Sequence, residues 1–575
     1  MNKSKNIFQI EINSFKKQIK NSKTLYLIKN LAYIESNIQA MEFDSLKYSA
    51  EIQDYFLKNR KIHELICVEY DKLWMQNNND YIWASRTTEF NTLQNNLLEN
   101  LLIVNYALEK IECNLYNKII TDIDLVAYGI SEQLKNKNIS HKKINFKSVQ
   151  RIKIRFWLKN IKIIFYNWYF YFIAKRKIKP KFFVNNTVIL HTFPDKNSLN
   201  SQKYTERYFP FLSEYLESNN KNIKYWFSEC NLNNLPLMKH LNTENLLFNQ
   251  YQYLRVTDYL YASYQFMKLA KLIPRLFRLQ DQNYSKFFRI SHFQEGIDQG
   301  SFEAILVYLL IRRLKDSLPN DSQFILEFEG MIFERMFYLS KIKYFNEMKT
   351  IGYQHGALLR DLFCIRLTPG LRKIAVPNRI ICTGKKYSEF LHSIGFNSKI
   401  IEIGPALRYQ YLYEKQNLNK KISKKILVIL PFDKEISDYI IRNIRQVFKN
   451  SSYSIKYKFH PMSEAKDLNN DWLLKQDIEV RNLSQCMFEY SYIFGSKSSS
   501  CLEAILAQKQ VIEFIHPFRF NFSPLFLDSK AIRYVKIINS QLIQILEEDS
   551  NISNMNLKRE YFTSINKINL GKFLL

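Results

Sequence analysis

The sequence has few of the residues that break secondary structure. It holds 12 glycines and 13 prolines among 575 residues, about 2% each, against roughly 7% and 5% in average proteins. Collagen-like and low-complexity chains need far more of both. A chain with 46% hydrophobic and 15% aromatic residues can instead bury large cores. The composition therefore excludes a fibrous or disordered protein, and the length predicts two or three domains.

Paired cysteines are also missing. The seven cysteines are scattered and form no Cys-x-x-Cys pair, which argues against a disulfide framework and against a zinc cluster. The first residues lack the apolar run of a signal peptide. We also find no run of the ~20 apolar residues that a membrane-spanning helix needs. We therefore expect a cytoplasmic protein without a metal site.

Acidic residues are absent from one long interval. From 133 to 194 there is no Asp or Glu, while fifteen Lys and Arg lie between Lys135 and Lys181, about half of the net charge of +29. The centre of this interval, 163–174, reads IIFYNWYFYFIA and is too short to cross a bilayer. Aromatic segments flanked by cations are typical of contact with an anionic membrane surface. We predict such contact through 135–181; the alternative is a core helix with solvated ends.

A second basic stretch, 267–280, reads MKLAKLIPRLFRLQ. Its cations recur every three or four residues, which predicts a helix with one basic face, kinked at Pro274. Basic faces are often merely solvated. Zinc-finger spacing, an RNP-like stretch and a heptad-plus-basic region are all missing, so we expect no nucleic-acid partner.

From about residue 185 the pattern changes to short apolar runs, each followed by a helical stretch. The runs TVILHTF, QFILEFEG, KTIGYQHG and RIICTG predict buried strands, and a second series, KILVILPF, SIKYKFHP, YIFGSKSSS and QVIEFIHP, follows a polar linker at 413–425. Alternation of strand and helix predicts an α/β fold with parallel sheets. We expect two Rossmann-like lobes that face a cleft between the carboxyl ends of two sheets.

The predicted division of the chain has five parts. They are a helix-rich N-terminal region of unknown role (1–134), the basic aromatic segment (135–184), a first lobe on the acceptor side (185–412), a second lobe on the nucleotide side (413–545) and a C-terminal tail (546–575).

Candidate site residues are those that directly follow the predicted strands, because open α/β sheets bind ligands beyond the carboxyl ends of their strands. In the first lobe these are Glu327, Glu329 and Gly330, then Gln354, His355 and Gly356 as the lining of a substrate cleft. In the second lobe they are His460 and Pro461, then Gly495 and the serines Ser498, Ser499 and Ser500.

Each candidate has a plain structural alternative. Glu329 could act as a general base toward a hydroxyl, or it could be a carboxylate in the first turn of a helix. His460 could assist the departure of a phosphate, or be a histidine satisfied at a strand end. The serines could bind a phosphate, or only cap the helix that follows. The three candidates together are stronger evidence for a functional site than each is alone, because transfer from an activated sugar to an alcohol needs a base in one lobe and a phosphate site in the other.

The order of acid–Gly (Glu329–Gly330), His-Pro (His460–Pro461) and the serine pair resembles the bacterial sialyltransferase superfamily of GT-B transferases, and also capsule Kdo transferases. The resemblance implies that the acid is the base, that the histidine assists CMP departure, that the serines hold the CMP phosphate and that no metal is required. The chain also resembles bacterial surface-carbohydrate biosynthesis proteins in LEFEGMIFERMF, TIGYQHGALLRDL and FRFNFSPLF. This likeness covers roughly 185–530.

Two features depart from the family pattern. The acid motif has Glu327 displaced by one position, and strand alternation would place Glu327 and Glu329 on the same face, so either could be the base. A second His-Pro occurs at His516, and we prefer His460 because it precedes the serines. Arg408 and Lys458 could add positive charge to the site, although solvated surface positions are the alternative for both.

The sequence thus predicts an inverting, metal-independent glycosyltransferase of surface polysaccharide biosynthesis (capsule, O-antigen or lipopolysaccharide). It would transfer a nonulosonate or Kdo from a CMP-sugar to a glycan or lipid-linked glycan, at the inner face of a bacterial cytoplasmic membrane. One alternative keeps the fold with UDP- or GDP-sugar or CDP-glycerol donors. Another is a non-catalytic scaffold on the membrane surface.

Overall fold

The computed structural model describes most of the chain. The described residues are 9–12, 24–27, 44–59, 61–92, 95–113, 115, 118–121, 123–137, 148–177, 182–193, 206, 208–227, 247–269, 271–272, 277–279, 282–414, 424–460, 463, 475–516, 519–524, 532–536, 538–548 and 555–575. Pro461, Pro274 and most of the 413–425 linker lie outside these residues.

The first lobe is built on a parallel sheet. Among the described residues, seven strands pair in the order β12-β11-β10-β9-β4-β5-β6, every pair parallel. The central strands β4 (Thr187–Thr192) and β9 (Gln323–Glu327) are buried throughout, as strands covered on both faces must be. The others are β5 (Asn222–Phe227), β6 (Leu247–Asn249), β10 (Lys349–Gln354), β11 (Arg379–Cys382) and β12 (Ile401–Ile403).

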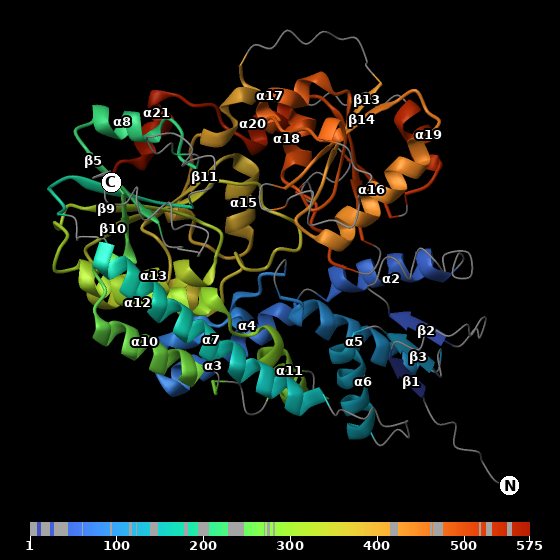
Figure 1. Cartoon of the computed structure of the whole chain (residues 1–575), viewed down its shortest axis with the longest axis horizontal. Coiled ribbons are helices and arrows are strands. Elements are labelled where there is room, and N and C mark those ends of the chain that lie inside the picture. The colour runs from blue at the N-terminus through green and yellow to red at the C-terminus, as the bar shows by residue number, and fades with distance from the viewer. Residues whose placement is uncertain are drawn as a thin grey trace.

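Helices cover this sheet. The helix α12 packs against α13 and α10, and Figure 1 shows these helices as one layer below the strands of the first lobe. The helices of the lobe are α8 (Leu212–Ser218), α10 (Val256–Leu269), α11 (Ser285–Glu295), α12 (Gln299–Leu314), α13 (Ile332–Tyr344), α14 (Pro369–Ile374) and α15 (Lys385–Ser393). The short helix η5 (Leu407–Leu412) ends the lobe.

The second lobe repeats the scheme on a smaller scale. In the described part of the chain, five parallel strands pair in the order β14-β13-β15-β16-β17. They are β13 (Lys425–Ile429), β14 (Ser454–Lys458), β15 (Tyr492–Gly495), β16 (Gln510–Phe514) and β17 (Arg533–Val535). The helices are α16 (Lys434–Phe448), α17 (Leu483–Cys486), α18 (Ser500–Leu506) and α19 (Gln541–Glu547).

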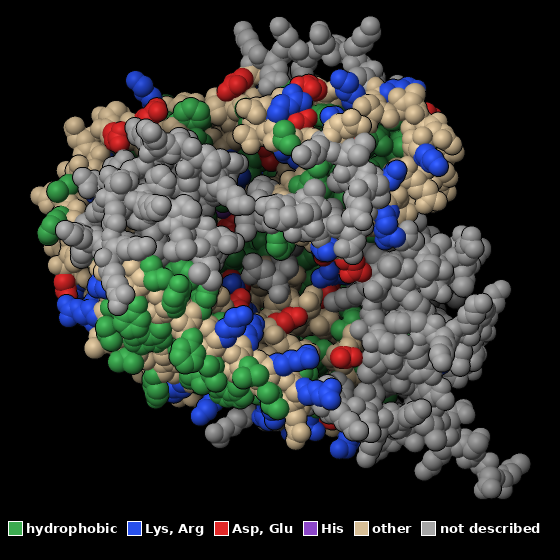
Figure 2. Space-filling model, viewed as in Figure 1, with side chains coloured by type: hydrophobic (Ala, Val, Ile, Leu, Met, Phe, Trp, Pro, Cys, Tyr) green, Lys and Arg blue, Asp and Glu red, His purple; other side chains and the backbone are tan. Residues whose placement is uncertain are grey.

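The strand orders identify both lobes as Rossmann-like. Counted within its own lobe, the first sheet runs 3-2-1-4-5-6-7 and the second 2-1-3-4-5, and these are the two common doubly wound orders. Figure 2 shows a hollow between the lobes. The predicted α/β fold with two lobes of the GT-B type is therefore confirmed.

The N-terminal region is not a detached extension. It holds a small parallel sheet, β1-β3-β2, of strands Gln9–Ile12, Lys118–Thr121 and Thr24–Leu27, which the sequence analysis did not predict. Its helices are α2 (Asp44–Lys58), α3 (Ile62–Asn77), α4 (Arg86–Glu89), α5 (Leu97–Glu112) and α6 (Asp124–Asn136). Figure 1 shows these helices below both lobes.

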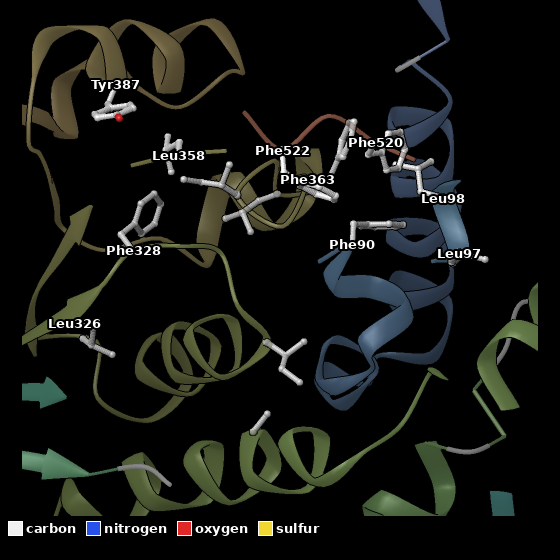
Figure 3. Close-up of a cluster of buried hydrophobic side chains, with 14 of the residues drawn as sticks. Phe90, Leu97, Leu98, Leu326, Phe328, Leu358, Phe363, Tyr387, Phe520 and Phe522 are labelled. Carbon is white, nitrogen blue, oxygen red and sulfur yellow. The ribbon is translucent and has the colours of Figure 1, made fainter. Parts of the chain in front are cut away.

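One continuous apolar core joins the N-terminal region to both lobes. The ring of Phe520, from the second lobe, lies 4.9 Å from that of Phe56 and 5.7 Å from that of Phe363. Figure 3 shows this core between the elements that form it, with the labelled side chains Phe90, Leu97, Leu98, Leu326, Phe328, Leu358, Phe363, Tyr387, Phe520 and Phe522. The three parts therefore share buried apolar surface, the main favourable contribution to folding.

Within the basic aromatic segment, residues 148–177 form one long helix, α7 (Ser148–Lys177). It packs against α10, α11 and α12 of the first lobe. A search of the described helices finds none with the length and apolar character needed to cross a membrane.

One expectation about local structure is wrong. Residues 267–280 do not form one basic helix, because α10 ends at Leu269 and the short strand β7 (Arg278–Leu279) follows; β7 pairs with β8 (Gln282–Asn283).

The C-terminal tail packs on the first lobe. The ring of Phe573 lies 5.3 Å from that of Tyr353, and Gln323 Nε2 donates to the Phe573 carbonyl. The helices of the tail are α20 (Met555–Tyr561) and α21 (Lys567–Leu570).

Candidate active site

Each sheet has one point at which the strand order reverses. In the first lobe it lies between β4 and β9, and in the second between β13 and β15. At such a point the loops leave the two strands in opposite directions and open a crevice at the carboxyl edge, where doubly wound folds bind their ligands. Both crevices are lined by charged or polar side chains.

The first crevice contains a buried histidine–glutamate pair. His191, near the end of β4, places Nδ1 2.6 Å from Oε2 of Glu327, the last residue of β9. Both side chains are buried. Burial raises the pKa of Glu327 well above its usual value, and the charge of Glu206 raises it further. The Glu327 carboxylate is therefore paired with His191 and is not accessible to solvent.

Glu329 differs sharply from Glu327. The strand ends at Glu327, so the expected alternation does not extend to Glu329, and the two carboxylates do not share a face. The Glu329 side chain is 41% exposed, and its Oε1 lies 3.6 Å from Nε2 of His355. Although the carboxylate reaches solvent, burial among the surrounding atoms and the charge of Glu327 raise the pKa of Glu329 to about 7. A carboxyl group with this pKa can accept a proton at neutral pH.

Two buried charged residues of α13 shape the loop that carries Glu329. The carboxylate of Glu334 accepts hydrogen bonds from the backbone N–H groups of Glu329, Gly330 and Met331, at 3.0 to 3.3 Å. Arg335 is also buried. It donates to four carbonyl oxygens, those of Gly330, Thr88, Glu89 and Cys364. The N-terminal region thus helps to fix the loop.

Gly330 is required by the backbone. Its φ is +77°, and an added Cβ would lie 2.3 Å from the carbonyl oxygen of Cys364. Only glycine adopts this conformation readily and leaves this space free. Gly330 thus has a structural role, since it sets the direction in which the chain leaves Glu329; its place in the substrate cleft stays a prediction.

The other predicted cleft residues have different surroundings. Gln354 is buried and accepts from the backbone N–H and hydroxyl of Thr383, so it joins two strands rather than lining a cleft. His355 is buried, and among the described residues no partner reaches its Nδ1. Burial, with the charge of Arg408, lowers its pKa well below the usual value, so this imidazole is neutral. An added Cβ at Gly356 would meet open space.

Arg408 connects the two lobes at the site. It lies on η5, and its guanidinium is 5.3 Å from the Tyr208 ring. Its positive charge favours the ionised forms of Glu327, Glu329 and Glu503 and so partly opposes the burial that raises their pKa values. Glu503 belongs to α18 of the second lobe, accepts a hydrogen bond from Tyr411 of η5 and is partly exposed. The helix that follows the serine run therefore packs against the segment that faces Glu329.

The second crevice is more open than the first. Phe432, just after β13, is 65% exposed, and its ring lies 5.7 Å from that of His460, just after β14. The His460 side chain is exposed as well, yet the atoms packed beside it lower its pKa below the usual value. The opening thus presents one aromatic ring and one imidazole at adjacent strand ends.

The serine run lies on the other side of this reversal point. Ser498 Oγ accepts from the backbone N–H of Ser500, and Ser499 precedes α18 without a side-chain cap; all three are partly exposed. Gly495 lies deeper, where an added Cβ would be 2.5 Å from Cys501 Sγ, so it allows α18 to pack closely against β15.

A lysine links the serine run to β13. Lys497 Nζ is 3.3 Å from Oδ2 of Asp433, which also accepts from Arg519 at 3.0 Å. Burial, followed by the charge of Arg519, lowers the pKa of Lys497 to about 8. His516, the alternative His-Pro histidine, is buried.

Several site residues were missed or undervalued by the sequence analysis. His191 and Phe432 lie within the predicted runs TVILHTF and KILVILPF, near their carboxyl ends, so a search limited to residues after the runs missed them. Arg408 was predicted either to add positive charge to the site or to be a solvated surface residue. Its side chain is exposed, and its relation to Glu503 and Glu329 depends on both lobes. Glu334 and Arg335 gave no signal, because helical carboxylates and guanidinium groups are usually exposed. Among the described residues, no group of three or more His, Cys, Asp or Glu is arranged to hold a metal ion.

Comparison with known proteins gives weak likenesses. No family model matches the chain. A curated protein that it matches is the DNA-directed RNA polymerase subunit beta'' of Plasmodium falciparum (isolate 3D7), 24% identical over 262 residues, which are 42% of this chain and 23% of the subunit. The chain thus spans about a quarter of the length of that relative, and this level of identity does not assign a family.

Similar solved structures include three bacterial or archaeal proteins. The first is UDP-GlcNAc 2-epimerase of Methanocaldococcus jannaschii with UDP-GlcNAc and UDP, which is 14% identical and has a TM-score of 0.39; the match covers 68% of this chain and 98% of that chain. The second is UDP-GlcNAc 2-epimerase of Neisseria meningitidis with UDP-GlcNAc, which is 11% identical with a TM-score of 0.39, over 68% of this chain and 99% of that chain. The third is S. aureus MnaA with UDP, which is 11% identical with a TM-score of 0.39, over 68% of this chain and 95% of that chain. TM-scores this low indicate only partial overlap, so the fold assignment rests on the strand orders.

Proposed function

We propose that this chain is an inverting glycosyltransferase that uses a nucleotide-activated sugar in surface polysaccharide biosynthesis, with Glu329 as the general base. The observation that carries the proposal is the state of Glu329. Its carboxylate is partly exposed at the carboxyl edge of the first sheet, with a pKa raised to about 7. A general base needs access to the reacting hydroxyl and a pKa near the working pH, and Glu329 has both.

The division of roles between the two glutamates follows from their surroundings. Glu329 takes the proton of the acceptor hydroxyl, whose oxygen bonds to the anomeric carbon of the donor while the nucleotide leaves. Glu327, bonded to His191 and closed to solvent, is a positioning residue. Its charge is one cause of the raised pKa of Glu329, so it keeps the base able to hold the proton it accepts.

The second crevice suits the nucleotide. An exposed aromatic ring, Phe432, is available to stack on a nucleobase. The hydroxyl groups of Ser498 and Ser499 and the imidazole of His460 can donate hydrogen bonds to the phosphate as charge develops on it. Because the pKa of His460 is lowered, it acts as a neutral donor rather than as a cation. Arg408 supplies positive charge that acts on both Glu329 and Glu503.

We propose a CMP-linked nonulosonate or Kdo as the donor, because the order of acid–Gly, His-Pro and serine motifs resembles the CMP-dependent families. The acceptor is a hydroxyl of a glycan, either free or carried on a lipid. UDP- and GDP-sugars and CDP-glycerol belong in the same test, since the residues of the second crevice do not distinguish between nucleobases.

Activity with a panel of donors tests the proposal. The protein is incubated with CMP-sialic acid, CMP-Kdo, UDP- and GDP-sugars and CDP-glycerol, and released nucleotide is measured. We expect release from CMP donors, reduced about 10²- to 10⁴-fold in Glu329→Gln, as for loss of a general base. The matched control is Glu389→Gln, an exposed glutamate on α15, which should retain full activity.

Three results would contradict parts of the proposal. Release only from UDP donors would overturn the donor class, and full activity in Glu329→Gln would overturn the base. No nucleotide release, together with no nucleotide-dependent shift in melting temperature, would favour the non-catalytic scaffold.

A further inference from the structure

The outer face of α7 carries an unusual row of exposed apolar side chains. Six of them, exposed by 43 to 71%, recur every three or four residues and so lie on one side of the helix. We call them the outer stripe: Ile154, Leu158, Ile161, Phe165, Tyr169 and Phe172. The row extends for about 27 Å along the helix axis. Soluble proteins rarely expose contiguous apolar surface on this scale.

The opposite face of α7 is fully used in packing. Phe156 contacts Phe293 of α11 with ring centroids 5.0 Å apart, and Tyr171 contacts Tyr259 of α10 at 4.3 Å. Asn167 forms hydrogen bonds with Gln299 of α12. The helix is therefore docked firmly, and the exposure of the outer stripe is not the result of a loosely attached segment.

The helix α10 extends the apolar surface. Trp168 of α7 donates from Nε1 to Ser263 of α10 at 3.1 Å, which places the two helices side by side. On α10, Val256, Leu260, Tyr261 and Tyr264 are exposed by 41 to 60%. Figure 2 shows hydrophobic side chains gathered over this part of the first lobe, on the same face as the hollow between the lobes.

Six cations of α7 have described side chains: Lys153 lies over the ring of Phe293, and the other five divide into two groups. Lys159 and Lys175 donate to backbone carbonyl groups of the first lobe, and so hold the helix in place. Arg151, Arg155 and Lys162 are exposed, and among the described residues none of them forms an ion pair. By helical spacing they lie along one edge of the outer stripe. The whole helix contains no acidic residue.

We propose that the outer stripe and the exposed apolar residues of α10 dock this protein on a lipid surface with anionic headgroups. The apolar and aromatic side chains enter the boundary between headgroups and acyl chains, while the row of cations pairs with the anionic headgroups. A second copy of the chain fits this face poorly, because symmetric pairing would bring two acid-free, basic helices together. The inference does not depend on the proposed enzymatic activity.

Vesicle co-sedimentation tests the docking face. The full chain is mixed with vesicles of phosphatidylcholine alone or of phosphatidylcholine with phosphatidylglycerol, and we expect binding chiefly to the anionic vesicles. The variant Leu158→Gln/Phe165→Gln/Phe172→Gln should lose this binding. The matched control Val480→Gln/Ile568→Gln changes two side chains exposed by 84% and 82% on other elements and should bind as the unmodified chain does.

A charge variant separates the two contributions. In Arg151→Gln/Arg155→Gln/Lys162→Gln, affinity for anionic vesicles should fall by roughly fivefold for each cation removed, and this loss should disappear at high salt. Lys399→Gln/Lys449→Gln/Lys567→Gln removes three exposed cations elsewhere and should have a much smaller effect. Melting temperature confirms that each variant is folded, because every position is exposed.

Any of three results would overturn the proposal. The first is no sedimentation with anionic vesicles, and the second is sedimentation that the apolar triple variant leaves unchanged. The third is a dimer, measured by sedimentation velocity, that the apolar triple variant converts to a monomer while vesicle binding is absent; the face would then be covered by a second copy. Both readouts remain valid whether or not the chain transfers a sugar.

Discussion

The two crevices of this molecule are built in opposite ways. In the first lobe, buried charged residues from β4, α13 and the N-terminal region fix one loop and leave one carboxylate open, Glu329. In the second lobe, Phe432 and His460 are exposed and the serine run is held by few bonds. A rigid edge suits a group whose position sets a reaction, and an open edge suits a ligand that must enter and leave.

The strongest test of this contrast removes Arg335. In Arg335→Met, four carbonyl oxygens lose a buried donor, so we expect a loss of about 3–5 kcal/mol in the free energy of unfolding. Urea denaturation measures it. Lys385→Met, at an exposed position of α15, is the control and should change stability by less than about 0.5 kcal/mol. A similarly small loss in Arg335→Met would show that the first crevice does not depend on buried charge.

A glycine pair gives a second, smaller test. Gly330→Ala forces a side chain into a positive-φ position against the Cys364 carbonyl, and we expect about 1–3 kcal/mol of destabilisation together with reduced activity, because the loop carries Glu329. Gly356→Ala enters open space and should be close to neutral. Equal stability of the two variants would contradict the structural role of Gly330.

In the second crevice the expected effect is on binding alone. Phe432→Ala removes an exposed ring, so stability should be nearly unchanged, while the Kd for the nucleotide should rise about tenfold through lost stacking. Isothermal titration calorimetry measures the Kd. A Kd identical to that of the unmodified chain would show that the nucleobase does not lie on this ring.

The smallest expected effect is the pH dependence of activity and stability that Glu329 causes. Its pKa is raised from 4.5 to about 7, and a base acts when ionised, so kcat/KM should rise with pH through about 7. The folded chain holds this proton more tightly than the unfolded chain does. The contribution of Glu329 to stability should therefore fall as pH rises from about 4.5 to 7, and remain low above that. In Glu329→Gln this part of the pH dependence should disappear; its persistence would assign the pKa to another group.

All eight predicted strands are present, and most of them are the continuous apolar runs expected of strands buried on both faces. The strands β6 and β17 were missed because three residues are too few to show a pattern; β5 and the N-terminal sheet were missed as well. The interpretation of Glu327 and Glu329 as equivalent was wrong, since it extended strand alternation beyond the last residue of β9.

The sequence alone determined the α/β class, the position of Glu329 and His460 after strands, and the acid-free aromatic helix, because all three depend on local order along the chain. Only the tertiary structure decided which glutamate is open and which is closed. That difference depends on His191 of β4, which is far along the chain from Glu327, and on Glu334 and Arg335 of α13, whose burial the helix sequence does not reveal. It also decided that only one face of α7 is exposed, because the other face is covered by helices that lie about a hundred residues further along the chain.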